Sequence, residues 1–211
     1  ISKSVTGLAF QPDVAFLIQC SHTTAAPHGP TGDRSCNLGF ATGPSNEGTV
    51  AVNCDAGSTT GNCGTYGLAV ESVAALSVTV PHTTPTSRGE FTQFTSGGFD
   101  LNYLEVITTG ERFFYAVVKG GSWAVGNTVT SVTLNADVVV SGLSFQPRGA
   151  MLLSSGRAAS TQDTSTSAMD LSVGAFHGAS NQVAAAIQME EGVGNMEIAT
   201  AADFNQCYVN L

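Results

Sequence analysis

The stretch Val5-Thr-Gly-Leu-Ala-Phe-Gln-Pro12 returns 135 residues later as Val140-Ser-Gly-Leu-Ser-Phe-Gln-Pro147. The same offset carries the pattern Gly-x-x-x-Gly-x-Ser-Asn from residues 39–46 onto residues 174–181 without a gap. Similarity at a fixed period indicates one structural unit used more than once. The sequence therefore predicts an internal repeat whose signature residues set strands and turns, namely Gly7, Phe10, Pro12, Gly142, Phe145 and Pro147.

The repeat divides the chain into three predicted parts. Residues 1–122 form a first unit that contains a long hairpin, and residues 123–139 form a connector. Residues 140–211 form a second, partial unit that packs with the first and is expected to lack a counterpart of residues 77–120.

Each signature segment is followed by an apolar run. Because proline cannot donate to a β-ladder, Pro12 and Pro147 are each predicted to end a strand. The runs Val14–Cys20 and Ala150–Ser155 that come next indicate buried strands.

The middle of the chain has the clearest alternation. Apolar and polar residues alternate along Phe99–Val106, which predicts a half-buried strand. A turn at residues 108–110 is expected to join it to Arg112–Val118 in a β-hairpin whose aromatic residues face a core. Short strands separated by Gly-, Pro- and Ser-rich turns are typical of sandwiches. We therefore predict an all-β fold, a β-sandwich or jelly roll built from the repeat.

Composition narrows the classes of function. Charged residues make up 11% of the 211 residues, well below the roughly 25% of an average soluble domain, so we expect much of the surface to be buried against partners. A net charge of −9 and seven scattered basic residues argue against binding to a phosphate backbone. No apolar stretch is long enough for a membrane span. The prediction is therefore no nucleic-acid partner and no membrane partner.

No local pattern favours catalysis. The sequence contains neither a Gly-x-Ser-x-Gly elbow nor a Gly-x-x-x-x-Gly-Lys-Ser/Thr phosphate loop. His22 and His28 share a loop with Asp33, but solvated side chains are the more common outcome of such a grouping than a metal site. We therefore expect no enzyme, and no catalytic, cofactor-binding or metal-binding residues.

Two of the five cysteines are placed so that they could form a disulfide. Cys54 and Cys63 flank a loop rich in Gly, Ser and Thr, which a disulfide could close. An extracellular particle would permit such a bond. The alternative is that both are buried thiols, which behave as small hydrophobic residues.

Three motifs carry a resemblance. The segments Gly39–Asn46, Gly97–Tyr103 and Phe114–Gly121, together with the Gly-Leu-x-Phe-Gln-Pro signature, resemble repeat-containing virion proteins of tailed bacteriophages. That resemblance covers residues 5–121 and 140–211. Residues 91–119 alone are also similar to the H-type lectin sandwich. The first resemblance implies a non-enzymatic particle component.

The function expected from this resemblance is capsid decoration. Such a cement protein would bridge capsomers on the outer surface of a phage head, as a trimer or dimer, with the major capsid protein and copies of itself as partners. The segments Ile1–Ser4 and Tyr208–Leu211 are candidate arms that would pair with neighbouring subunits.

Two alternatives remain open. One is a carbohydrate-binding module of a tail fibre or spike, in which Trp123 and Tyr66 would stack on a host-surface glycan. In the competing interpretation, Trp123 plugs the edge of the sandwich. The other alternative is a tail-tube subunit, which would need a ring-forming sheet.

Overall fold

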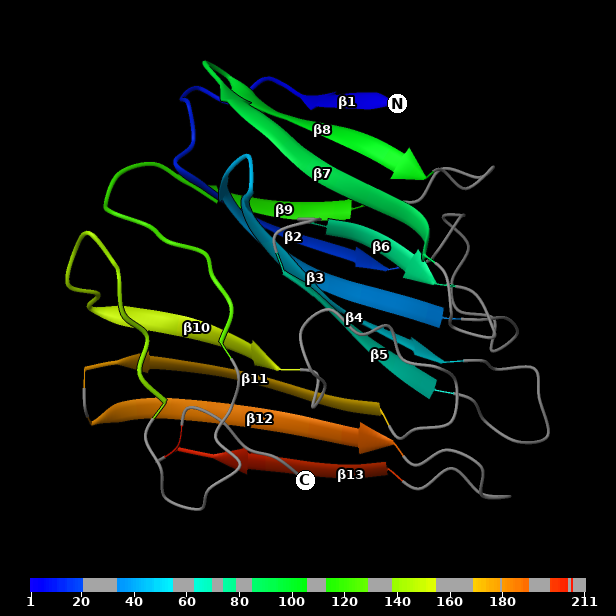
Figure 1. Cartoon of the computed structure of the whole chain (residues 1–211), viewed down its shortest axis with the longest axis vertical. Coiled ribbons are helices and arrows are strands. Elements are labelled where there is room, and N and C mark those ends of the chain that lie inside the picture. The colour runs from blue at the N-terminus through cyan, green and yellow to red at the C-terminus, as the bar shows by residue number, and fades with distance from the viewer. Residues whose placement is uncertain are drawn as a thin grey trace.

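In the part of the chain that the computed structural model describes, all regular elements are β-strands, arranged in three antiparallel sheets (Figure 1). The structure describes residues 1–20, 34–54, 63–69, 74–78, 85–105, 113–128, 138–154, 169–178, 180–189, 198–204 and 206, and every structural statement below refers to these residues. The predicted all-β fold of sandwich type is confirmed.

The largest sheet has five strands in the order β5-β4-β3-β2-β9. Its strands are β2 (Val14–Cys20), β3 (Arg34–Gly43), β4 (Asn46–Cys54), β5 (Cys63–Ala69) and β9 (Phe113–Val118). The apolar run predicted as a buried strand is β2, at the bounds expected.

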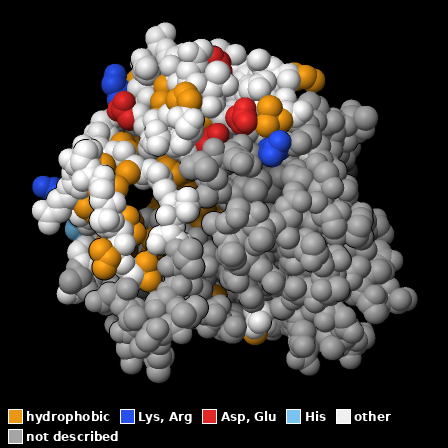
Figure 2. All heavy atoms as spheres, in the orientation of Figure 1, with side chains coloured by type: hydrophobic (Ala, Val, Ile, Leu, Met, Phe, Trp, Pro, Cys, Tyr) orange, Lys and Arg blue, Asp and Glu red, His pale blue; other side chains and the backbone are white. Residues whose placement is uncertain are grey.

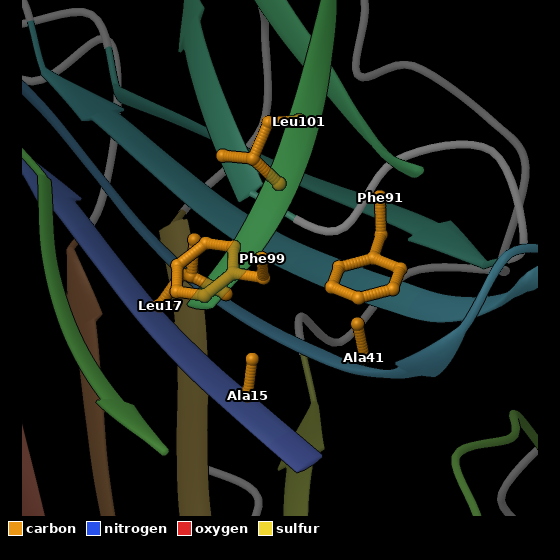
Figure 3. Close-up of a cluster of buried hydrophobic side chains, with 6 residues drawn as sticks. All are labelled: Ala15, Leu17, Ala41, Phe91, Phe99 and Leu101. Atoms are coloured by element: carbon orange, nitrogen blue, oxygen red, sulfur yellow. The ribbon is translucent and has the colours of Figure 1, made fainter. Parts of the chain in front are cut away.

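A second sheet has the order β1-β8-β7-β6 and covers one face of the first. Its strands are β1 (Ser2–Val5), β6 (Ala74–Val78), β7 (Pro85–Thr95) and β8 (Gly98–Glu105). The core between the two layers is drawn in Figure 3 and consists of Ala15, Leu17, Ala41, Phe91, Phe99 and Leu101.

Complementary size explains this core. The small Ala15 and Ala41 of the five-stranded sheet are fully buried, so their strands leave room for the rings of Phe91 and Phe99 from the covering sheet (Figure 3). Those two rings stack with centroids 6.3 Å apart. The alternation predicted from Phe99 onward is confirmed, since Phe99 and Leu101 are both completely buried.

The predicted hairpin of residues 99–106 and 112–118 is wrong. Strand β8 pairs on one side with β1 and on the other with β7, so both of its edges are occupied. Strand β9 therefore pairs with β2 in the opposite layer. Phe99 and Tyr115 meet across the sandwich instead, with ring centroids 5.4 Å apart.

The N-terminal segment is also not an arm of the predicted kind, because β1 pairs with the same chain's β8, from Ser2 opposite Asn102 to Val5 opposite Phe99. Gly98 makes this approach feasible, since a Cβ there would lie 1.7 Å from the carbonyl oxygen of Val5. The other candidate arm, Tyr208–Leu211, lies outside the described residues.

The third sheet has the order β10-β11-β12-β13. Its strands are β10 (Gly149–Ser154), β11 (Met169–His177), β12 (Asn181–Met189) and β13 (Ile198–Asp203). They start 135 residues after β2, β3, β4 and β5, respectively. The three pairings of β2 to β5 also recur at this offset, because Phe16↔Phe40, Leu38↔Val50 and Val50↔Gly67 become Met151↔Ala175, Val173↔Ala185 and Ala185↔Ala202.

The signature residues lie just before β2 and β10. Gly7 and Gly142 have φ angles of +92° and +83°, a region that favours glycine. Phe10 and Phe145 are half-buried, whereas Pro12 is buried and Pro147 exposed. Residues 6–13 and 141–148 contain no strand, so the prediction that the two prolines end strands is wrong: each precedes one.

Candidate functional site

The five-stranded sheet has a second face that the β1-β8-β7-β6 sheet does not cover. Side chains alternate along β2, so Ala15 and Leu17 enter the core while Phe16 and Ile18 lie on the opposite face. We call the group formed there by Phe16, Ile18, Phe40, Phe114 and Trp123 the outer aromatic face.

The register of the sheet brings these side chains together. Phe16 is directly opposite Phe40 of β3, and Ile18 is directly opposite Phe114 of β9. The Phe16 and Phe40 rings pack edge to face with centroids 5.5 Å apart. Phe114 is 68% exposed and Ile18 42% exposed, whereas Phe16 and Phe40 are half-buried, so the face is open to solvent mainly at Phe114 and Ile18.

Trp123 is held in place by a turn after β9. Gly120 and Gly121 both have positive φ angles, +93° and +84°. The amide of Gly120 donates to Oδ2 of Asp13 at 2.5 Å, and the indole Nε1 of Trp123 donates to the carbonyl oxygen of Gly120 at 2.7 Å. The Trp123 ring then packs edge to face on Phe16, with centroids 6.2 Å apart, yet remains 41% exposed.

Glu47, a carboxyl group with a raised pKa, lies on the other, inner face of the five-stranded sheet. Glu47 of β4 is buried, and its Oε2 accepts a hydrogen bond of 2.6 Å from the amide of Phe91 in β7. Burial raises the pKa of Glu47 to about 7; the Phe91 hydrogen bond opposes this, and the nearby Glu90 adds to it. Glu47 therefore ties the two layers together through this hydrogen bond.

The pKa of Asp100 on β8 shifts in the opposite direction. The side-chain amide of Gln93 donates to Oδ2 of Asp100 at 2.8 Å. This bond, helped by one from Ser4, lowers the pKa of Asp100. Among the described residues, no three His, Cys, Asp or Glu side chains are grouped as metal ligands would be. The loop with His22, His28 and Asp33 lies outside the described residues.

The predicted glycan contacts are not brought together. Trp123 follows β9 at one edge of the five-stranded sheet, whereas Tyr66 belongs to β5 at the opposite edge, where its backbone pairs with Ala51. The side chain of Tyr66 lies outside the described part of the chain.

The cysteines predicted as a disulfide do meet in register. Cys54 is the backbone partner of Cys63 in the β4–β5 pair. Opposed residues of antiparallel strands have Cα atoms about 4.5–5.5 Å apart, which is within the range that a disulfide requires. The oxidation of this pair stays a prediction.

Sequence reasoning missed most of the outer aromatic face. The sequence indicates Trp123 as a candidate contact, but it predicts Phe16 and Ile18 in a buried strand and Phe114 in a core, and it assigns no site to Phe40. One signal was available: the run of residues 113–118 is apolar without alternation, which is typical of a strand that buries both faces.

Comparison with known proteins adds no family. No protein-family model matches the chain, and no curated protein and no solved structure matches it significantly. Among the described residues, no helix has the length and apolar character needed to cross a membrane.

Proposed function

We propose that the chain is a non-enzymatic structural protein of a bacteriophage virion, a decoration protein that bridges capsomers on the outer surface of the head. The observation that carries this proposal is the outer aromatic face, because exposed apolar patches of this kind mark protein–protein contacts. The low proportion of charged residues, 11%, supports a subunit that buries much of its surface. The motif resemblance supplies the virion context.

In this function Phe114 and Trp123 are the anchors of the contact. Large aromatic side chains dominate binding energy at the centre of interfaces, and Trp123 is already fixed by its bond to the Gly120 carbonyl. A side chain that is ordered before binding loses little conformational entropy on association. The partners are the major capsid protein and further copies of this chain, in a dimer or trimer.

Add-back to stripped particles tests the contact. Particles from the source phage, freed of this protein, are incubated with recombinant chain and sedimented. We expect Phe114→Ser to lower the bound amount at least tenfold, because an anchor substitution costs on the order of 2 kcal/mol. The matched control is Phe204→Ser, since Phe204 is equally exposed but lies after β13. Equal binding by both variants contradicts the proposal.

Electron microscopy of the native particle tests the location separately. Density for this chain on the outer face of an icosahedral shell is the expected result. Density at a tail tip or along a tube would reject the decoration role while leaving the outer aromatic face available as a contact surface.

Trp123 favours one second candidate, a carbohydrate-binding module. Its exposed ring is rigidly held, as a stacking platform for a sugar should be. In that case the isolated chain binds a glycan array, and Trp123→Ala abolishes binding while Phe204→Ala does not. Absence of glycan binding by the folded wild-type chain removes this candidate.

A further inference from the structure

The strands β10–β13 repeat the order and the pairing register of β2–β5 at an offset of 135 residues. The two sheets differ at one edge. In the first sheet β2 is followed outward by β9, which pairs with it from Val14 opposite Val118 to Gln19 opposite Phe113. In the β10–β13 sheet β10 is the edge strand, and no described strand pairs with its other edge. An open edge offers a row of backbone donors and acceptors to another chain.

The segment before β10 differs in the same way. Residues 138–140 correspond in the sequence, at the offset of 135, to residues 3–5 of β1, which pair with β8. They form no strand, and Val138, Val139 and Val140 are 44%, 78% and 62% exposed. Figure 2 shows hydrophobic side chains on the left of the molecule, the side on which residues 138–148 lead into β10 in Figure 1.

We propose that the outer edge of β10 binds an antiparallel β-strand of another polypeptide that has the pattern of β9, aromatic and aliphatic residues followed by Gly-Gly. Main-chain hydrogen bonds along β10 would supply the affinity, as in other cases of strand addition. The β9 of a second copy is not that strand, because it is already paired with β2 of its own chain. This inference does not depend on the virion role.

The charge of the residue that precedes β10 indicates which residue the partner strand has opposite it. Asp13 precedes Val14, so extending the β2–β9 register by one residue places Asp13 opposite Lys119. The amide of Asp13 donates to the Val118 carbonyl at 2.8 Å, which anchors this end of the pair. The residue 135 positions after Asp13 is the exposed Arg148. Like charges in opposed positions are unfavourable, so the partner strand has an acidic residue where β9 has Lys119.

The chemistry can be probed with β9 itself. Two labelled peptides are added to the full chain: one with the sequence of residues 111–121, and one with the same sequence except for Lys119→Glu. Binding is followed by fluorescence anisotropy, and its place by hydrogen exchange of residues 149–154. We expect saturable binding and slowed exchange in β10. The Lys119→Glu peptide should bind about two- to fivefold more tightly, the range of a cross-strand charge pair.

An exchange of charge on the protein supplies the matched control. In Arg148→Glu the preference should reverse, so that the unaltered peptide binds more tightly. Circular dichroism verifies that this exposed substitution leaves the fold intact. The proposal is overturned if neither peptide slows exchange in β10. It is also overturned if β10 is already protected in the chain alone and sedimentation reveals a dimer, since a second copy would then cover the edge.

Discussion

The sheets β2–β5 and β10–β13 have the same order and register, yet only the first is covered by a described second layer. Ala41 of β3 leaves space for the ring of Phe91, whereas the residue 135 positions on is Phe176, which brings its own bulk. The comparison teaches that one pattern of strand order and register accepts side chains of very different size at the same position.

The largest effect expected from this comparison follows removal of a ring that the covering β1-β8-β7-β6 sheet packs onto the β2–β5 strands. Phe99→Ala should cost about 3–5 kcal/mol of unfolding free energy, the range for a large buried side chain, because Phe99 is fully buried against both layers. Urea denaturation measures the loss. Hydrogen exchange should accelerate in β2–β5 and remain unchanged in β10–β13.

Met151→Ala is the control for that prediction. Met151 of β10 is 55% exposed, so its truncation should cost under about 1 kcal/mol. Accelerated exchange in β10–β13 caused by Phe99→Ala would show that the two sheets unfold as one unit, and would break the comparison.

Strands that depend on local sequence patterns could be predicted from the sequence, whereas the pairing of strands far apart in the chain could not. Alternation and apolar runs depend on neighbouring residues, so the strands β2, β8 and β10 were predictable. The predicted burial of β10 is wrong, since its residues are exposed or half-buried. The partner of β9 was not, because β8 loses its free edge only when β1, nearly a hundred residues away, takes it. The exposure of Phe114 depends on that same choice, since it is the pairing with β2 that turns this side chain outward.

The second prediction concerns the pair Cys54 and Cys63, which lies where the other sheet pairs Met189 with Ile198. If the pair is oxidised, the Cys54→Ser, Cys63→Ser double variant should lose about 2–4 kcal/mol. Thiol labelling of unfolded protein with and without reductant measures the oxidation. Full labelling without reductant would mean that Cys54 and Cys63 are not linked, so that they resemble the pair Met189 and Ile198 of the β10–β13 sheet.

The third prediction is a pH dependence specific to the first sheet. The pKa of Glu47 is raised by burial from 4.5 to about 7, so between these values the folded chain holds a proton that the unfolded chain has lost. The free energy of unfolding therefore falls as pH rises from 4.5 to 7. Glu47→Gln removes this loss and should be more stable than wild type by about 1–3 kcal/mol at pH 8, with little difference at pH 4.5.

The β10–β13 sheet already has a glutamine at the corresponding position. Gln182 stands 135 residues after Glu47, so the variant makes the two sheets alike at this position. Gln188→Leu, on a half-buried site of β12, serves as a control that should leave the pH profile unchanged. A Glu47→Gln profile parallel to that of wild type would contradict the assignment.

The smallest effect tests whether the approaches to the two sheets are equivalent. A Cβ at Gly7 or Gly142 would meet no atom within 4 Å, so Gly7→Ala and Gly142→Ala act only through their positive φ angles. Each should therefore cost a similar amount, about 1–2 kcal/mol, measured by urea denaturation and by exchange in the strand that follows. Gly126→Ala is the control, because Gly126 has equal space without a positive φ. If Gly7→Ala lowers the free energy of unfolding and Gly142→Ala does not, the two approaches are not equivalent. The chain before β10 then adjusts its backbone freely, as expected of a segment whose neighbouring strand is not bound.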